Sequence, residues 1–319
     1  MNLLRGSTSL VGILGWPIGH SLSPNMHNAM FAELGLDWAY VPFPVRPGDL
    51  SKALKGLIAL NIIGVNVTVP HKQAVMRHMD EVSKAAQTVG AVNTIHIKDG
   101  KFVGYNTDST GFLNSLIEAN CHPKGLRVAV LGAGGAARAV VFALAWAEVD
   151  SVVVLNRTAE RAAFLIDDLI DAFPGSTLHF APLTESSVVA LKDSFDLVIN
   201  TTTVGMSPYV NDCPWPKNIP MPVTAAYCDL VYNPLETVFL ARARAAGAKT
   251  IDGLGMLIHQ GVAVFELWTG QKAMAEVMRQ AGLAGLTINH EYQLKRNESP
   301  DLTGYRNLSG LKLTTDHDR

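Results

Sequence analysis

The segment Val128-Ala-Val-Leu-Gly132-Ala-Gly134-Gly135-Ala136-Ala137-Arg138 decides the fold of this chain. An apolar, β-branched run ends in a glycine turn, and the turn opens directly onto an alanine-rich helical pattern. A glycine-rich turn between a strand and a helix is the context in which a dinucleotide is bound. The glycines allow a tight turn and a close approach of the backbone to a pyrophosphate, which the first amides of the helix then face. A tight turn without a ligand is the alternative.

A basic motif, Asn156-Arg157-Thr158, follows where the next strand is expected to end. Sites for NAD place an acidic residue there, which accepts a hydrogen bond from the ribose 2′-hydroxyl. Arg157 cannot accept that bond but pairs well with a phosphate, and Arg161 stands four residues later on the same helical face. We therefore expect NADP as the cofactor. The residues expected to bind it are Gly132, Ala133, Gly134, Gly135, Ala136, Asn156, Arg157, Thr158 and Arg161.

The composition is typical of a compact globular protein. The 319 residues are 48% hydrophobic and 17% charged, and 26 basic against 28 acidic residues leave a net charge of −2. Nothing in this balance favours nucleic acid or a membrane as a partner. The three cysteines are interpreted as reduced thiols, the ten histidines form no metal-binding motif, and the apolar run at 10–19 is interpreted as a buried strand. We expect a cytoplasmic monomer or homodimer without a metal.

Strand and helix patterns alternate along most of the chain. The first hundred residues predict strands at 11–15, 40–44 and 64–69, helices at 23–34 and 47–60, a helical stretch from Pro70 and a strand pair turning at Asp99-Gly100. A helix at 108–120 leads to strands at 127–131, 151–155, 195–200, 225–229 and 249–251, with helices at 135–147, 158–173 and 235–246. Two apolar helices are expected at 253–268 and 271–283.

These patterns predict an α/β protein with two α/β domains, an N-terminal substrate domain with a mostly parallel sheet and a doubly wound, Rossmann-type NADP-binding domain. A helix pair that follows a completed sheet commonly returns to an earlier domain. We therefore expect residues 1–107 and 256–287 to form the first domain, and residues 108–255 to form the second. Beyond residue 287 the chain turns polar and loses periodicity, so residues 288–319 are expected to form a flexible tail.

Five further motifs occur in order along the chain. They are Gly15-Trp-Pro-Ile-Gly-His-Ser21-Leu-Ser23-Pro24-Asn-Met-His-Asn28, Asn66-Val-Thr68-Val-Pro-His-Lys72, Gly90-Ala-Val-Asn93-Thr, Gly104-Tyr-Asn106-Thr-Asp108 and Asp252-Gly253-Leu-Gly-Met-Leu-Ile-His-Gln260. Together with the glycine turn and the basic motif, they make the chain closely resemble the shikimate dehydrogenase family from about residue 10 to residue 283. Several independent motifs in one order are far more specific than any one of them.

The resemblance implies an enzyme that reversibly reduces 3-dehydroshikimate to shikimate with NADPH, in the shikimate pathway of aromatic amino acid biosynthesis. It implies Lys72 and Asp108 as the catalytic pair, with Lys72 as proton donor and acceptor. Reduction of a ketone needs a proton on oxygen as well as hydride on carbon, and a positioned donor is worth about 10²- to 10⁴-fold. The implied substrate-binding residues are Ser21, Ser23, Thr68, Lys72, Asn93, Asp108, Tyr232 and Gln260. The cofactor residues added by the resemblance are Thr203, Met206 and Gly253.

Each of these residues also has an ordinary structural role open to it. Ser23 before Pro24 suits a helix N-cap, Asp108 could cap the helix that follows it, and Lys72 could be a solvated lysine. Two functional alternatives also stay open. One is a quinate/shikimate dehydrogenase of broader specificity, although Ser23 stands where quinate-preferring members often have threonine. The other is a non-catalytic sensor of shikimate or quinate, against which the presence of both Lys72 and Asp108 argues.

Overall fold

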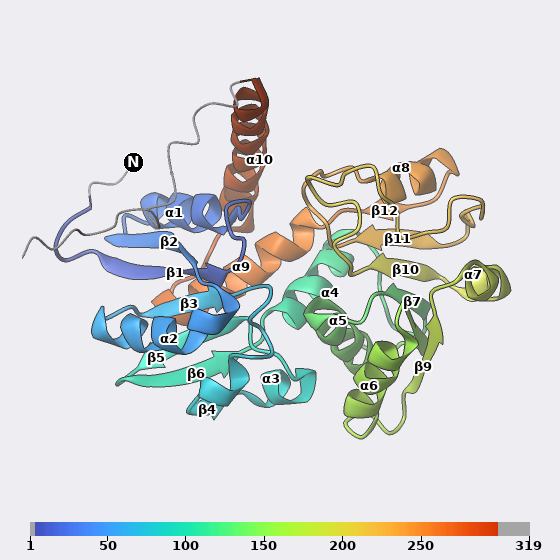
Figure 1. The fold of residues 1–319 in the computed structure, drawn as a ribbon, viewed down its shortest axis with the longest axis horizontal. Coiled ribbons are helices and arrows are strands. Elements are labelled where there is room, and N and C mark those ends of the chain that lie inside the picture. Colours follow the sequence, from blue (N-terminus) through green and yellow to red (C-terminus); the bar gives the residue numbers. More distant parts are fainter. Residues whose placement is uncertain (1–3, 299–319) are drawn as a thin grey trace, which may run out of the picture.

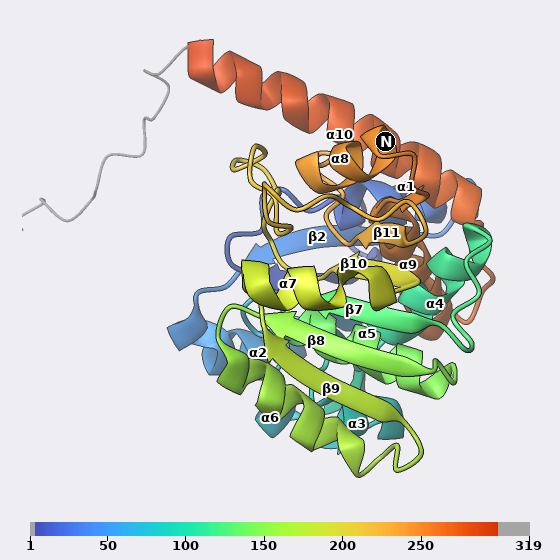
Figure 2. The same cartoon turned by 90° about the vertical axis from the view of Figure 1, so that its right-hand side faces the viewer.

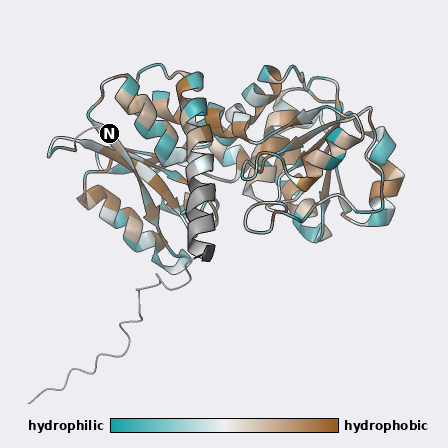
Figure 3. Cartoon of the chain, turned by 90° about the horizontal axis from the view of Figure 1, so that it is seen from above, coloured by the Kyte–Doolittle hydropathy of each residue, from teal (hydrophilic) through white to brown (hydrophobic). Residues whose placement is uncertain are grey.

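The computed structural model describes residues 4–298, and it describes side chains as far as residue 287. Figure 1 shows two lobes, each built around its own six-stranded sheet. The expected pair of α/β domains is therefore confirmed as a fold class. Helices cover the sheets, and in Figure 3 the hydrophobic parts of the ribbon gather inside each lobe.

The first lobe contains the N-terminal sheet. Its strands are β1 (Ser9–Gly15), β2 (Trp38–Pro44), β3 (Gly64–Val67), β4 (Glu81–Val82), β5 (Thr94–Lys98) and β6 (Lys101–Tyr105). Its helices are α1 (Ser23–Glu33), α2 (Leu50–Ala59) and α3 (Lys84–Val89). The strand order is β2-β1-β3-β5-β6-β4. Strand β5 is antiparallel to both of its neighbours and the remaining pairs are parallel, so the sheet is mostly parallel as predicted.

The second lobe contains a wholly parallel sheet. Its strands are β7 (Arg127–Leu131), β8 (Ser151–Asn156), β9 (Thr177–Pro182), β10 (Leu197–Asn200), β11 (Ala226–Asp229) and β12 (Thr250–Ile251). Its helices are α5 (Gly135–Trp146), α6 (Ala159–Ile170), α7 (Glu185–Leu191) and α8 (Val238–Ala245). The order β12-β11-β10-β7-β8-β9 is the doubly wound arrangement, and β11, β10, β7, β8 and β9 can be followed side by side in Figure 2. The order reverses between β7 and β10, where such sheets bind dinucleotides.

Alternation along β7 explains why helices cover both faces of this sheet. Val128 and Val130 are buried with α4 (Asp108–Glu118), α5 and α6, whereas Ala129 and Leu131 are buried with α7 and α8 on the other face. Successive side chains of a strand point to opposite faces, so a strand that is apolar at every position is buried on both sides. The apolar run that precedes the glycine turn is therefore a central strand.

After the second sheet is complete, the chain returns to the first lobe through α9 (Leu254–Thr269) and α10 (Ala275–Glu298). Ile258 and Phe265 of α9 are buried with Met26 and Phe31 of α1 and with Val11 of β1. In Figure 1, α9 and α4 lie between the two sheets. The functional motifs at the two ends of the chain are brought together by this return.

Two expectations about local structure are wrong. The predicted helical stretch from Pro70 is instead a series of turns followed by a short 3₁₀ helix, Met76–His78. The carbonyl of Lys72 accepts the Val92 amide at 2.8 Å, which ties these turns to a distant segment of the first lobe. The chain also forms β4, β9 and α7, where no such element was expected.

The expected flexible tail from residue 288 is also partly wrong. Helix α10 continues through residues 288–298. The sequence over these residues contains neither glycine nor proline, and Pro300 is the first helix-breaking residue. The remaining residues of the expected tail, 299–319, lie outside the described part of the chain.

Candidate active site

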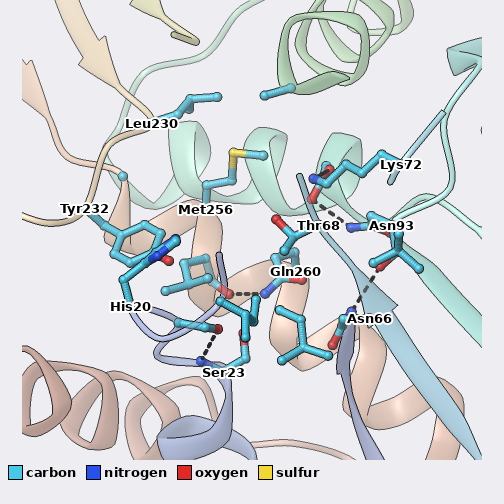
Figure 4. Close-up of a pocket in the computed structure, with 18 residues that line it drawn as sticks. His20, Ser23, Asn66, Thr68, Lys72, Asn93, Leu230, Tyr232, Met256 and Gln260 are labelled. Carbon is cyan, nitrogen blue, oxygen red and sulfur yellow. Dashed lines mark hydrogen bonds and ion pairs between the residues drawn. The ribbon is translucent and has the colours of Figure 1, made fainter. Parts of the chain in front are cut away.

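A cavity between the two lobes collects the residues that the sequence motifs single out. The residues expected to bind substrate all line it: Ser21, Ser23, Thr68, Lys72, Asn93, Asp108, Tyr232 and Gln260. They come from the loop after β1 and the start of α1, the turns after β3, the residue before β5, the start of α4, the loop after β11 and the second turn of α9. Figure 4 shows Lys72 and Asn93 on one side of this cavity and His20 and Tyr232 on the other.

An ion pair between Lys72 and Asp108 forms one wall of the cavity. Lys72 Nζ lies 2.5 Å from Asp108 Oδ2, and the two side chains are 18% and 7% exposed. Asn93 Nδ2 donates to Asp108 Oδ1 at 2.7 Å, while Asn93 Oδ1 accepts the Thr107 amide at 2.8 Å. Both oxygens of the carboxylate are therefore occupied, which fixes its orientation toward the lysine. A charge-assisted hydrogen bond of this kind is stronger than a neutral one.

Buried hydrogen bonds continue from this pair into the first sheet. Thr94 Oγ1 donates to Asn93 Oδ1 at 3.0 Å, and Asn66 Nδ2 donates to Thr94 Oγ1 at 3.1 Å. The Tyr40 hydroxyl in turn donates to Asn66 Oδ1 at 2.8 Å, and burial raises the pKa of this phenol above its usual value. Asn66 also lines the cavity and was not singled out from the sequence. Its position two residues before Thr68, on the same side of an extended chain, was the available signal.

The opposite wall carries groups that are neutral at physiological pH. Burial raises the pKa of Tyr232 to about 12 and lowers the pKa of His20 below its usual value. His20 and Met256 line the cavity and were also missed by sequence reasoning. Gly253 lines this cavity and not the cofactor cleft, where it was expected. A Cβ at this position would lie 2.4 Å from the Leu230 carbonyl oxygen, so the close approach of these two segments requires a glycine.

A second cavity lies beside the glycine turn, where the strand order of the second sheet reverses. The expected cofactor residues that line it are Gly132, Ala133, Gly134, Gly135, Ala136, Asn156, Arg157, Arg161, Thr203 and Met206. Gly132 has φ +110°, and a Cβ there would lie 2.8 Å from Thr201 Oγ1. No side chain caps α5 at Gly134, so no side chain shields the first amides of the helix from a phosphate.

The basic motif borders the same cleft. Arg157 and Arg161 both line it, and within residues 4–287 neither forms an ion pair with a protein carboxylate. Thr158 lines neither cavity, contrary to expectation; its carbonyl accepts the Asn156 side-chain amide at 2.8 Å and so orients that residue. Two guanidinium groups beside an uncapped helix start fit a dinucleotide that carries a 2′-phosphate.

A buried network anchors the loops that line the cleft beyond β10 and β11. Asp229 accepts Asn200 Nδ2 at 2.9 Å, the Val231 amide at 3.0 Å and the Thr237 hydroxyl at 2.6 Å. Asn200 Oδ1 accepts the Thr202 amide at 3.0 Å. Burial raises the pKa of Asp229 to about 6. The carboxylate therefore fixes the two loops relative to each other at a cost in its own solvation.

The two cavities meet. The residues that line both of them are His20, Thr68, Lys72, Ala136, Leu230 and Tyr232. A dinucleotide in the cleft and a small molecule in the first cavity would therefore be neighbours at the Lys72 ammonium. Such a fold and site define a class of protein, the two-domain α/β oxidoreductases that transfer hydride between a nicotinamide and a small polar substrate.

Comparison with known proteins narrows this class. Residues 13–95 match the shikimate dehydrogenase substrate binding domain, residues 116–210 the shikimate/quinate 5-dehydrogenase family and residues 253–281 the shikimate 5′-dehydrogenase C-terminal domain. A shikimate dehydrogenase (NADP⁺) of Moorella thermoacetica is 50% identical over 276 residues, which are 86% of this chain and 92% of that protein. The chain therefore belongs to the shikimate dehydrogenase family.

Solved structures agree with this assignment. A crystal structure of a shikimate dehydrogenase in complex with NADP⁺ has a TM-score of 0.84 at 42% identity, covering 89% of this chain and 98% of that one. The Thermus thermophilus enzyme in complex with NADP(H) and shikimate has a TM-score of 0.78 at 38% identity, covering 87% of this chain and all of that one (100%).

None of the helices in the described part of the chain is long and apolar enough to cross a membrane. Likewise, no group of three or more His, Cys, Asp or Glu side chains within that part of the chain is arranged to hold a metal ion.

Proposed function

We propose that this chain interconverts 3-dehydroshikimate and shikimate with NADP, with Lys72 transferring the proton and Asp108 holding Lys72 in place. One observation carries the assignment of roles: Lys72 lines both cavities and forms a 2.5 Å ion pair with a buried carboxylate. Family membership supports the reaction, and the relatives crystallised with NADP⁺ or with NADP(H) and shikimate support the two ligands.

The chemistry of a ketone reduction assigns the steps to these groups. When bound in the cleft, NADPH would supply the hydride that the carbonyl carbon takes up. Lys72, as the ammonium, donates a proton to the carbonyl oxygen, which becomes the hydroxyl; in the reverse direction the neutral amine removes that proton. Asp108 stabilises the ammonium, and Asn93 keeps the carboxylate from turning away. General acid–base catalysis of this kind contributes about 10²- to 10⁴-fold to the rate.

We assign the remaining cavity residues to different groups of the substrate. Ser21 and Ser23 lie at the start of α1 and take the carboxylate of the substrate. Thr68, Asn93 and Gln260 offer hydroxyl and amide groups to the ring hydroxyls. The neutral phenol of Tyr232 closes the other side, where it can hydrogen-bond without adding charge. A small molecule with one carboxylate and several hydroxyls matches this distribution of groups.

The burial of the helices between the two sheets indicates how the chain divides into domains. We propose that residues 1–107 and 256–287 form the substrate domain and that residues 108–255 form the NADP-binding domain. The burial of α9 with α1 and β1 supports the first assignment, and the burial of Phe112 and Leu116 of α4 with β7 and β8 supports the second. Arg157 and Arg161, which line the cleft, would then hold the 2′-phosphate of a cofactor bound to the second domain.

The decisive assay measures formation of reduced cofactor with shikimate and with quinate, each tried with NADP and with NAD. The proposal expects the highest kcat/KM for shikimate with NADP. Comparable rates with quinate would favour the dehydrogenase of broader specificity, and comparable rates with NAD would contradict the role of Arg157. Binding of shikimate without turnover would favour the sensor.

A further inference from the structure

We propose that Arg138 is a positioning residue for the catalytic pair, tying the cofactor-binding helix α5 to the segment 89–93 that holds Lys72 and Asp108. This inference rests on the proposed function. Arg138 ends the motif that decides the fold, and it has no part in the cofactor or substrate site: it lines neither cavity.

The guanidinium of Arg138 is buried and bridges the two lobes. The residue is 8% exposed, and its Nε donates to the Val89 carbonyl, at the end of α3, at 2.6 Å. The next residue, Gly90, has φ +69°, and a Cβ there would lie 2.6 Å from Arg138 Nη2. A glycine at this position therefore has two roles: it adopts the left-handed conformation that ends α3, and it leaves space for the guanidinium.

The backbone of the segment that Arg138 holds is hydrogen-bonded directly to Lys72 and, through the side chain of Asn106, to Asp108. The Val92 amide donates to the Lys72 carbonyl at 2.8 Å. The Ala91 carbonyl accepts Asn106 Nδ2 at 2.9 Å, and Asn106 Oδ1 accepts the Asp108 amide at 3.1 Å. The segment ends at the asparagine whose side chain orients the Asp108 carboxylate. A shift of the segment would therefore move the lysine and the carboxylate relative to each other.

Helix α5 connects this contact to the cofactor cleft. Val89 and Ala91 are buried together with Ala139 of α5, one residue beyond Arg138. At the beginning of the same helix, a Cβ on Gly135 would lie 3.7 Å from the Lys72 stem, and Gly135 lines the cleft. One rigid helix thus touches the cofactor site, the stem of the catalytic lysine and the segment that orients the pair.

The ion pair between Arg138 and Asp168 is less suited to position the catalytic pair than the hydrogen bond from Arg138 to Val89. Arg138 Nη2 lies 2.8 Å from Asp168 Oδ2 of α6, but the Asp168 side chain is 57% exposed. Ion pairs with an exposed partner contribute little, whereas a buried carbonyl that loses a charged donor is left unpaired. The variant Asp168→Asn is therefore a matched control: it removes the ion pair and leaves the bond between the lobes intact.

The test compares Arg138→Met, Arg138→Lys and Asp168→Asn with the wild type. It measures the melting temperature, the Kd for NADPH from cofactor fluorescence, and the single-turnover rate of NADPH oxidation by 3-dehydroshikimate, which product release does not mask. For Arg138→Met we expect an unchanged Kd for NADPH and a rate lowered about 10- to 100-fold, the effect of misplacing reacting groups by a fraction of an ångström to one ångström. Arg138→Lys should recover part of the rate, and Asp168→Asn should keep the wild-type rate.

Each other result overturns the inference. A wild-type rate in folded Arg138→Met, a rate loss that only follows weaker NADPH binding, or an equal loss in Asp168→Asn would each exclude positioning through Val89. If Arg138→Met does not fold, Arg138→Lys decides alone. Its ammonium supplies a donor in a different geometry, so a rate below that of the wild type supports positioning, and a wild-type rate shows that the rate does not depend on the geometry of the bond to Val89. Absence of wild-type turnover would instead refute the proposed function, so the two failures are distinguishable.

Discussion

Replacement of Lys72 by alanine tests the proposed mechanism most directly. Loss of a positioned proton donor predicts a rate lowered about 10²- to 10⁴-fold, equivalent to about 3–5 kcal/mol of transition-state stabilisation. The structure predicts a second effect. The Asp108 side chain is only 7% exposed, and without Lys72 its charge has no counter-ion at 2.5 Å. Removal of one partner from a buried ion pair costs about 3–5 kcal/mol of folding stability, so stability and catalysis must be measured separately.

The double variant Lys72→Ala/Asp108→Asn separates the two effects. It removes the uncompensated charge, so we expect its stability in urea unfolding to exceed that of Lys72→Ala while its single-turnover rate stays equally low. Lys84→Ala, at an exposed lysine that begins α3, is the matched control and should keep the wild-type rate. Lys72→Ala that folds, binds NADPH and reduces 3-dehydroshikimate within about tenfold of the wild-type rate would refute the assignment of the proton donor.

Three other changes probe the cofactor site, the core and the helix contact. Arg157→Asp should raise the KM for NADP about 10- to 100-fold and leave the KM for NAD little changed, because a hydrogen bond to a charged group is worth about 1.5–3 kcal/mol. Equal changes of the two KM values in steady-state assays would exclude a contact between Arg157 and the 2′-phosphate. Burial lowers the pKa of His27 to about 3, so the folded protein disfavours the protonated ring and its stability falls as the pH drops below about 6.5. His27→Phe should remove this loss, and in urea unfolding at about pH 5 it should be about 2 kcal/mol more stable than the wild type. A gain in stability that does not depend on pH would contradict this explanation. Gly111→Ala places a Cβ 2.7 Å from the backbone nitrogen of Gln260, so it should push α4 away from α9 and lower the folding stability by about 1–3 kcal/mol. Steady-state assays should show a higher KM for shikimate and an unchanged KM for NADP. Gly56→Ala, whose Cβ would meet nothing within 4 Å, is the control and should change neither KM.

Most of the fold was predictable because its elements are long and carry strong periodicity. The run before Gly132 and the helix after it were predicted to within a residue or two, because β7 is a continuous apolar run that is buried on both faces. The elements that were missed depend on tertiary contacts. Strand β9 is paired on one side only and is largely exposed, so its sequence lacks an apolar pattern. The turns around Lys72 are bonded to a distant segment, since the Val92 amide donates to the Lys72 carbonyl, and no local sequence pattern predicts that bond.

The candidate site was predictable only where a motif carries it. Motifs brought Lys72 and Asp108 into consideration, although 36 residues separate them in the sequence. Asn66 and Arg138 stand inside quoted motifs, yet their contacts could not be predicted. Asn66 bonds to Thr94, 28 residues away, and Arg138 bonds to Val89, 49 residues away. A sequence motif identifies candidate site residues, but it does not predict which of their side chains are in contact in the folded chain.

The position of Asp108 explains why the two lobes must be held together for the reaction. Asp108 begins α4, whose Phe112 and Leu116 are buried in the core of the second lobe, yet its carboxylate is bound by Asn93 of the first lobe. One helix therefore joins the core that carries the cofactor to the side chains that carry the proton. A rotation of the lobes about α4 would strain the Asn93 contact unless a second tie limits it. The bond from Arg138 to the segment that ends at Asn93 lies where such a tie is needed, which is why a buried arginine outside both cavities should affect the rate.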